Sequence, residues 1–150
     1  MDTLSPEQRH AAMSHNRSRD TAPELRIRSA LHKIGFRFRK NDRRLSGTPD
    51  LVFPRYKAAL FVNGCFWHAH QNCAKFRLPS SNTEYWKKKL ARNRERDAAD
   101  AEKLAADGWR VGIVWECSIT GRNRAQKIQN VSEAVALWLE EEFSEPFVEF

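Results

Sequence analysis

Apolar residues in the first half of the chain recur first at helical spacing and then at strand spacing. After the cap-like residues 20–24, one apolar face predicts a helix that ends at Gly35. That face would consist of Leu25, Ile27, Leu31 and Ile34. Alternating apolar and basic residues at 36–39 predict a half-buried strand. The apolar runs 51–53 and 58–62 flank a proline-containing turn, and they predict a hairpin.

The second half of the chain also alternates between helix and strand patterns. Residues 84–106 are strongly helix-forming and are followed by Gly108, a typical stop signal. A short apolar strand is predicted at 111–114 and an amphipathic helix at about 124–142. The helix would bury Ile128, Val131, Val135 and Leu139. Residues 63–83 lack periodicity, which is typical of a functional or externally braced loop. The order favours an α/β fold, a single domain whose mixed central sheet is flanked by helices.

Composition narrows the class of partner. The 150 residues suit one domain, and a net charge of +7 favours a polyanionic partner such as a nucleic acid. A merely solvated basic surface is the alternative. The N-terminus lacks a secretory pattern, and no apolar run approaches the roughly 18 residues of a membrane span, so we expect a cytoplasmic protein without a membrane partner. Three cysteines make a poor disulfide framework but suit metal binding in a reducing compartment.

Thiols and imidazoles gather in the aperiodic segment at the spacing of metal ligands. Zinc prefers four tetrahedral ligands, and Cys₃His is a common structural set. Such a set is offered by Cys65, His70, Cys73 and Cys117. The alternative is that Cys65 and Cys117 are small buried hydrophobic residues and that His70 is solvated. Bound zinc would staple the loop to the core and would leave His68 without an assigned role.

Two carboxylates stand at positions that are expected to be buried. Asp50 follows Pro49 at the entry to an apolar strand, where it needs a partner or a metal ion such as Mg²⁺, which prefers oxygen ligands. An ordinary Pro-Asp turn is the alternative. Asp97 lies on the core-facing stripe of the helix 84–106, where an imidazole such as His68 would satisfy it. A partly exposed carboxylate on a charged helix is the alternative for Asp97.

Several segments together resemble the very short patch repair endonucleases (Vsr). They occur in order and at compatible spacing between about Met13 and Cys117. The segments are residues 19–24 (RDTAPE), 47–50 (GTPD), 61–68 (FVNGCFWH), 93–97 (NRERD), 108–111 (GWRV) and 114–117 (VWEC). The resemblance implies a restriction-endonuclease-like fold with a zinc-braced loop. It also implies Mg²⁺-dependent hydrolysis that nicks one strand on the 5′ side of the thymine in a T·G mismatch, which arises from deaminated 5-methylcytosine.

The resemblance also implies which residues act. Asp50 would bind magnesium together with the backbone carbonyl of Val62, and Glu24 would join through metal-bound water. His68 would activate the attacking water and would be oriented by Asp97. The zinc ligands would be Cys65, His70, Cys73 and Cys117.

The chain departs from the family pattern at two places. Asn63 stands where the family has a histidine, and an amide does not act as an acid or base, although it can hydrogen-bond a phosphate or water. Residues 69–72 also differ, so zinc ligation rests more firmly on the cysteines than on His70.

Adjacent aromatic residues are expected to read the mismatch. Phe66 and Trp67 would wedge into the base stack, because unstacking costs least at a mispair. Ordinary core packing is the alternative for this pair. The resemblance suggests that Met13 enters from the other side. We therefore expect a basic DNA-binding arm at residues 1–20, an endonuclease domain at 21–143 and a C-terminal tail at 144–150.

Partners and alternative functions follow from this interpretation. We expect a monomer of the bacterial, nucleoid-associated type that acts on double-stranded DNA with a T·G mismatch. Mismatch-repair proteins and a cytosine-5 DNA methyltransferase system are further expected partners. A zinc-stabilised DNA-binding protein that does not cleave is one alternative. The other is a restriction or homing-type nuclease of the same fold that cuts undamaged DNA.

Overall fold

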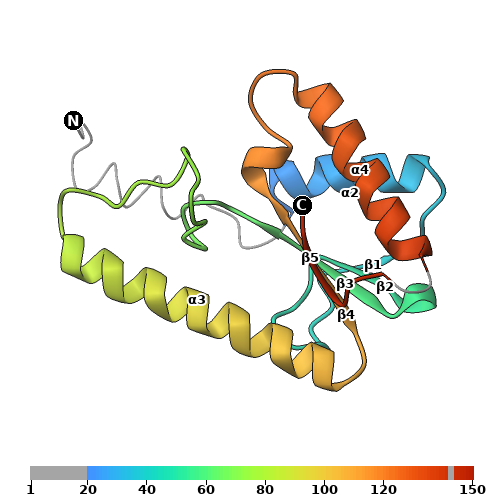
Figure 1. Cartoon of the computed structure of the whole chain (residues 1–150), viewed down its shortest axis with the longest axis horizontal. Coiled ribbons are helices and arrows are strands. Elements are labelled where there is room, and N and C mark those ends of the chain that lie inside the picture. The colour runs from blue at the N-terminus through green and yellow to red at the C-terminus, as the bar shows by residue number, and fades with distance from the viewer. Residues whose placement is uncertain (1–19, 142–143) are drawn as a thin grey trace.

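A five-stranded mixed sheet forms the centre of the computed structural model, which describes residues 20–141 and 144–150 (Figure 1). In spatial order the strands are β1 (Arg39–Lys40), β2 (Leu51–Phe53), β3 (Ala58–Asn63), β4 (Arg110–Trp115) and β5 (Phe147–Glu149). β2 is antiparallel to both of its neighbours, β1 and β3, whereas β3, β4 and β5 run parallel. The predicted arm up to residue 19, with Met13, lies outside the described residues. The predicted α/β class with a mixed sheet is confirmed.

Helices cover both faces of this sheet (Figure 1). They are α2 (Ala22–Lys33), α3 (Thr83–Ala106) and α4 (Arg124–Glu140), with short 3-10 turns at Pro54–Tyr56 and Glu116–Ser118. Leu60 and Val114 pack into one apolar cluster with side chains of α2 and α4, whereas Ala59 and Val111 pack with Leu104 of α3. Because β3 and β4 are buried on both faces, they read as continuous apolar runs.

Close packing against the sheet requires a glycine in β4. A Cβ atom on Gly112 would lie 2.9 Å from Cδ1 of Leu60 and 3.1 Å from the ring of Trp138 on α4. These distances are too short for carbon atoms in contact. The glycine therefore lets α4 lie close to the sheet.

The first predicted helix is confirmed as α2, but its predicted apolar face is partly wrong. Ile27 and Leu31 are fully buried, whereas Leu25 and Ile34 are 48% and 52% exposed. The helix instead turns Glu24 and Arg28 inward, where they form an ion pair. In α4, Val131, Val135 and Leu139 are buried as predicted, and Ile128 is half-buried.

The short outer strands differ most from the sequence prediction. The strand predicted at 36–39 is present only as Arg39–Lys40, because Phe36 and Phe38 leave the ladder to pack their rings against Phe53. The segment predicted as a tail contains β5, which pairs with β4. In the part of the chain that the structure describes, no helix is long and apolar enough to cross a membrane.

Candidate active site and metal centre

A cleft of about 830 Å³ opens where the ends of β2 and β3 face α3. Residues from distant parts of the sequence line it, among them Glu24, Asp50, Val62, Asn63, Trp67, His68 and Asp97. The structure therefore brings all the predicted catalytic residues to one cleft. Asp50 and His68 thus line the same cleft.

Asp50 is fixed by the backbone at the entry to β2. The register between β2 and β3 places Leu51 opposite Leu60, so the chain before Leu51 runs beside the end of β3. The backbone N–H of Val62 donates a hydrogen bond of 2.6 Å to Oδ2 of Asp50. Pro49 is buried and Asn41 donates its backbone N–H to the carbonyl of Asp50, so the main chain around the carboxylate is held on both sides.

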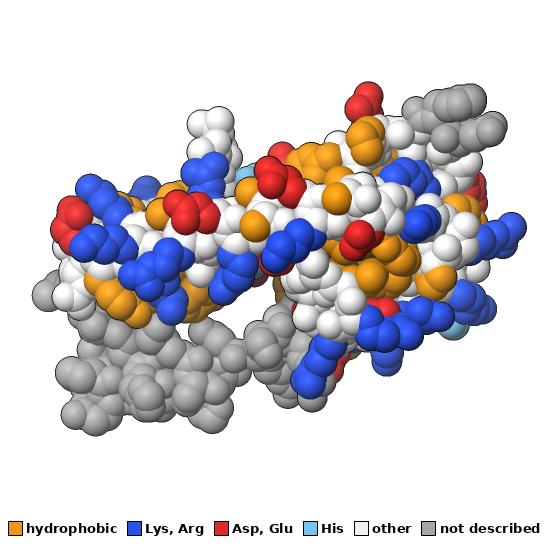
Figure 2. All heavy atoms as spheres, turned by 90° about the horizontal axis from the view of Figure 1, so that it is seen from below, with side chains coloured by type: hydrophobic (Ala, Val, Ile, Leu, Met, Phe, Trp, Pro, Cys, Tyr) orange, Lys and Arg blue, Asp and Glu red, His pale blue; other side chains and the backbone are white. Residues whose placement is uncertain are grey.

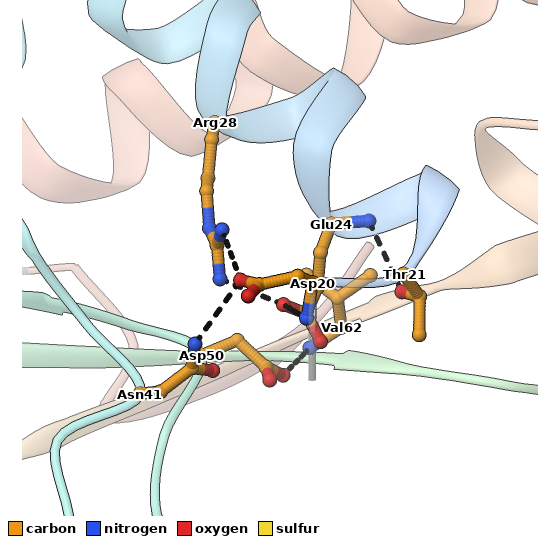
Figure 3. Close-up of polar contacts among 7 residues, drawn as sticks. All are labelled: Asp20, Thr21, Glu24, Arg28, Asn41, Asp50 and Val62. Atoms are coloured by element: carbon orange, nitrogen blue, oxygen red, sulfur yellow. Dashed lines mark hydrogen bonds and ion pairs between the residues drawn. The ribbon is translucent and has the colours of Figure 1, made fainter. Parts of the chain in front are cut away.

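Glu24 approaches Asp50 from α2 (Figure 3). Its carboxylate is buried, and Oε2 accepts hydrogen bonds from the backbone N–H of Asp20 at 2.9 Å and from Arg28 at 2.8 Å. Arg28 also donates to Oδ1 of Asp20 at 2.7 Å, and Asn41 donates to the same oxygen. The sequence analysis missed Arg28 and Asn41. The i, i+4 spacing of Glu24 and Arg28 was the available signal for the ion pair.

The two carboxylates are poorly neutralised by the protein alone. Burial, and then the negative charge of Glu24, raise the pKa of Asp50 from its ordinary value to about 8. The Val62 N–H and the charge of Arg28 act in the opposite direction but do not compensate. This pair joins the buried Glu24 to the half-buried Asp50 beside the polar backbone of Val62, and its excess of negative charge fits an oxygen-preferring cation such as Mg²⁺.

His68 and Asp97 form the opposite wall of the cleft. Nδ1 of His68 lies 2.5 Å from Oδ2 of Asp97, so the predicted contact between these residues is confirmed. The contact holds because α3 is attached to the loop by a second bond, from the side-chain amide of Asn93 to the carbonyl of Trp67 at 2.9 Å. With Nδ1 donating to a carboxylate, Nε2 is the nitrogen that carries the free lone pair.

Asn63 ends β3 between these two walls. Asn63 is 6% exposed and pairs with Trp115 of β4 in the parallel ladder. It lines the cleft and also a second cavity of about 380 Å³, which it shares with His68 and Asp97. From this position its amide can hydrogen-bond a bound group, but an amide does not transfer a proton.

The predicted cysteine and histidine set converges in the structure. One ligand atom from each of Cys65, His70, Cys73 and Cys117 lies within 4.8 Å of all the others. Tetrahedral coordination at about 2.3 Å separates two sulfur atoms by about 3.8 Å, so small adjustments suffice to bind zinc. Burial raises the pKa of the Cys65 thiol to about 12, and a bound metal ion would reverse this effect by binding the thiolate.

Backbone and ring contacts shape this metal centre. The N–H of His70 donates to the carbonyl of Cys65 at 2.9 Å, and the imidazole stacks on Trp115 with ring centroids 3.9 Å apart. Cys117 follows β4, so the cluster joins the loop to the sheet. The donor set and its convergence fit a structural zinc ion.

An aromatic cluster joins the loop of residues 64–82, here called the metal loop, to the start of α3. Phe66 and Trp67 are half-buried and stand edge to face with ring centroids 5.1 Å apart. Trp86 contacts both rings, at 5.4 and 6.0 Å, and Tyr85 of α3 contacts Trp86. Trp86 lies on the helix predicted at 84–106, but its place in this cluster was missed by the sequence analysis.

Comparisons with known proteins identify the family of this chain. A family profile described as "DNA mismatch endonuclease Vsr" matches residues 1–75. The chain is 50% identical to "Type II nicking enzyme V.XorIIP" of Xanthomonas oryzae over 79% of its length and 87% of that protein. It is 44% identical to "DNA mismatch endonuclease Vsr" of Escherichia coli, covering 81% of this chain and 77% of the relative. "Type II nicking enzyme V.NmeAIP" of Neisseria meningitidis is 40% identical over 81% and 86% of the two chains. The chain therefore belongs to the DNA mismatch endonuclease Vsr family and is a DNA endonuclease.

Proposed function

We propose that this endonuclease nicks duplex DNA on the 5′ side of the thymine in a T·G mismatch produced by deamination of 5-methylcytosine. One observation carries the proposal: the Asp50–Glu24 carboxylate pair and the His68–Asp97 pair line the two walls of one cleft. Water adds to phosphorus as the bond to the 3′ oxygen breaks. The products are a 5′ phosphate and a 3′ hydroxyl.

Asp50 and the backbone carbonyl of Val62 would hold magnesium, and Glu24 would join through water. A magnesium ion held there would polarise the scissile phosphate and would stabilise the negative charge of the leaving oxygen. The protein's own contribution is a rigid carboxylate, because Asp50 is anchored by the Val62 N–H. Glu24 is anchored by Arg28.

His68 acts as the general base. Asp97 accepts the Nδ1–H bond, which fixes the tautomer and leaves Nε2 to take the proton of the attacking water. Asn63 lies beside this pair in the cleft and hydrogen-bonds the phosphate or the water. The protonated His68 is stabilised by the negative charge of Asp97.

The metal loop presents the mismatch-reading side chains. Phe66 and Trp67 wedge into the base stack at the weak T·G step, braced by Trp86 and by zinc at Cys65, His70, Cys73 and Cys117. Met13, in the arm of residues 1–20, acts from the opposite side. Residues 21–143 carry the catalytic function as a monomer in a bacterial cell. Mismatch-repair proteins and a cytosine-5 methyltransferase system act in the same pathway.

The test compares duplexes that differ at one base. The protein is incubated with Mg²⁺ and a duplex carrying T·G or T·A at the same position, with each strand labelled in turn, and products are separated on a denaturing gel. We expect one nick, in the thymine strand of the T·G duplex only, and none with Asp50→Ala. Equal nicking of both duplexes, or full activity of Asp50→Ala, contradicts the proposal.

Site-specific nicking of undamaged DNA is the second candidate. Two of the three relatives described above are named type II nicking enzymes, which favours it. In the same assay this function produces an Asp50-dependent nick at one fixed sequence in matched DNA. The T·A duplex therefore separates the two functions.

A further inference from the structure

The charge of α3 reverses along its length, at the residue that contacts His68. Residues 87–96 contain six cations and one acid, whereas residues 97–107 contain four acids and one lysine. Figure 2 shows Lys and Arg side chains gathered over the N-terminal half of this helix. That half and the metal loop project together beyond the sheet (Figure 1). A polyanion leaving the cleft is attracted towards the N-terminal half of α3 and repelled from the other.

Three of the cations share one side of the helix. At 100° per residue, Lys89, Arg92 and Arg96 fall within about 60° of one another. Lys87 and Arg94 fall roughly on the opposite side of the helix by the same geometry. Arg96 lines the catalytic cleft next to Asp97, so this cationic stripe (Lys89, Arg92 and Arg96) begins at the cleft.

The stripe is available to a ligand. Arg92 and Arg96 are exposed, and Lys89 is half-buried. Within residues 20–141 and 144–150, no acid forms an ion pair with Lys89 or Arg92, whereas Lys87 pairs with Glu84 at 3.6 Å. Arg96 contacts only the neutral side chain of Asn93 among its described hydrogen bonds.

The dimensions of the stripe match a DNA strand. The seven helical steps from Lys89 to Arg96 span about 10.5 Å along the helix. Phosphates on one strand advance about 3.4 Å per nucleotide along the duplex axis, so the stripe covers about three steps. It leads from the cleft towards Trp86, where Phe66 and Trp67 gather.

We propose that Lys89, Arg92 and Arg96 form a track for the phosphates of duplex DNA, which runs from the scissile phosphate to the aromatic cluster on one side of the nick only. The inference rests on DNA as the substrate and deepens the proposed function, but it does not depend on T·G specificity. It assigns the direction in which the DNA leaves the cleft.

The test measures binding rather than cleavage. Duplex affinity is determined in magnesium-free buffer at several salt concentrations, for matched and T·G duplexes. Lys89→Gln and Arg92→Gln are each expected to reduce the salt slope by about 0.9, and the double variant by about twice that. The matched controls Lys87→Gln and Arg94→Gln remove the same charges two positions away and should leave the slope unchanged. Thermal melting checks that all variants fold.

The proposal is overturned if the salt slope falls equally in the stripe and control variants. It is also overturned if the salt slope of the stripe variants is unchanged. Phosphate-ethylation interference gives a second readout: the interference removed by Lys89→Gln and Arg92→Gln should lie on one side of the nick position. Loss on both sides contradicts the inference. Equal affinity for matched and T·G duplexes would count against the mismatch specificity alone and would leave the track standing.

Discussion

Asp50 owes its properties to two neighbours that are far away in the sequence. The Val62 N–H fixes one oxygen, and the carboxylate of Glu24 adds a second negative charge in a buried setting. A partner for Asp50 was predictable from the sequence, because a carboxylate at the entry to an apolar strand needs one. The Arg28 ion pair was not predicted, since a helical arginine is usually exposed.

The raised pKa of Asp50 predicts a pH-dependent stability. In the unfolded chain the carboxyl loses its proton near pH 4, whereas in the folded chain its pKa is about 8. Between these values the folded chain binds more protons, so the contribution of Asp50 to the free energy of unfolding falls as pH rises. Asp50→Asn should therefore unfold at higher urea than the wild type at pH 8 in magnesium-free buffer. The difference should shrink towards pH 4.

Asp107→Asn is the control, because Asp107 is exposed. It should follow the wild type at every pH. A difference between Asp50→Asn and the wild type that stays constant from pH 4 to pH 8 contradicts the assignment of the raised pKa to Asp50. Added Mg²⁺ should restore wild-type stability at pH 8.

At the scale of elements, the long and strongly patterned segments were predictable, and so was the apolar run that forms β2, whereas the two edge strands were not. The composition of residues 84–106 predicts a helix without knowledge of any tertiary contact, and these residues belong to α3. In contrast, β1 and β5 have two and three residues, and each is a strand only because β2 or β4 lies beside it. Sequence patterns do not report such long-range pairing.

The metal loop contains two histidines, His68 and His70, which should have separate roles. His70→Ala should lower the zinc content well below one per chain, because it removes one of four ligands. His68→Ala should keep near one zinc per chain and lose nicking, since His68 contacts Asp97 instead. Zinc is measured by a chromogenic chelator after unfolding.

These variants differ by two positions in one loop, so each serves as the control for the other. Full zinc retention in His70→Ala contradicts its role as a ligand. Zinc loss in His68→Ala would contradict the separation of the His68–Asp97 pair from the zinc ligands. Melting temperature should fall for His70→Ala, because the loop loses its attachment to β4 at Cys117.

At the scale of the molecule, Arg110 joins three parts of the fold. It donates to the carbonyls of Trp138 at 2.6 Å and Leu139 at 3.0 Å at the end of α4, and to the carbonyl of Tyr56 at 3.2 Å in the turn after β2. It also contacts Ser144 before β5. The Arg110 side chain thus connects β4 to the end of α4, to the turn after β2 and to the segment before β5.

Arg110→Met should destabilise the protein by about 2–4 kcal/mol, because it removes several charged hydrogen bonds and leaves their carbonyls unpaired. Urea unfolding measures the change. Arg122→Met, at an exposed position, should stay within about 0.5 kcal/mol of the wild type. Equal stability of the Arg110 and Arg122 variants contradicts this role.

The cleft draws Glu24 from α2, Asp50 from the entry to β2 and Asp97 from α3, so its walls meet only once these elements have packed together. A ribosome must have released at least the first 97 residues before both carboxylate walls exist. Under the proposed function, a nascent chain or fragment that ends before Asp97 lacks one wall of the cleft, and it should therefore fail to nick DNA.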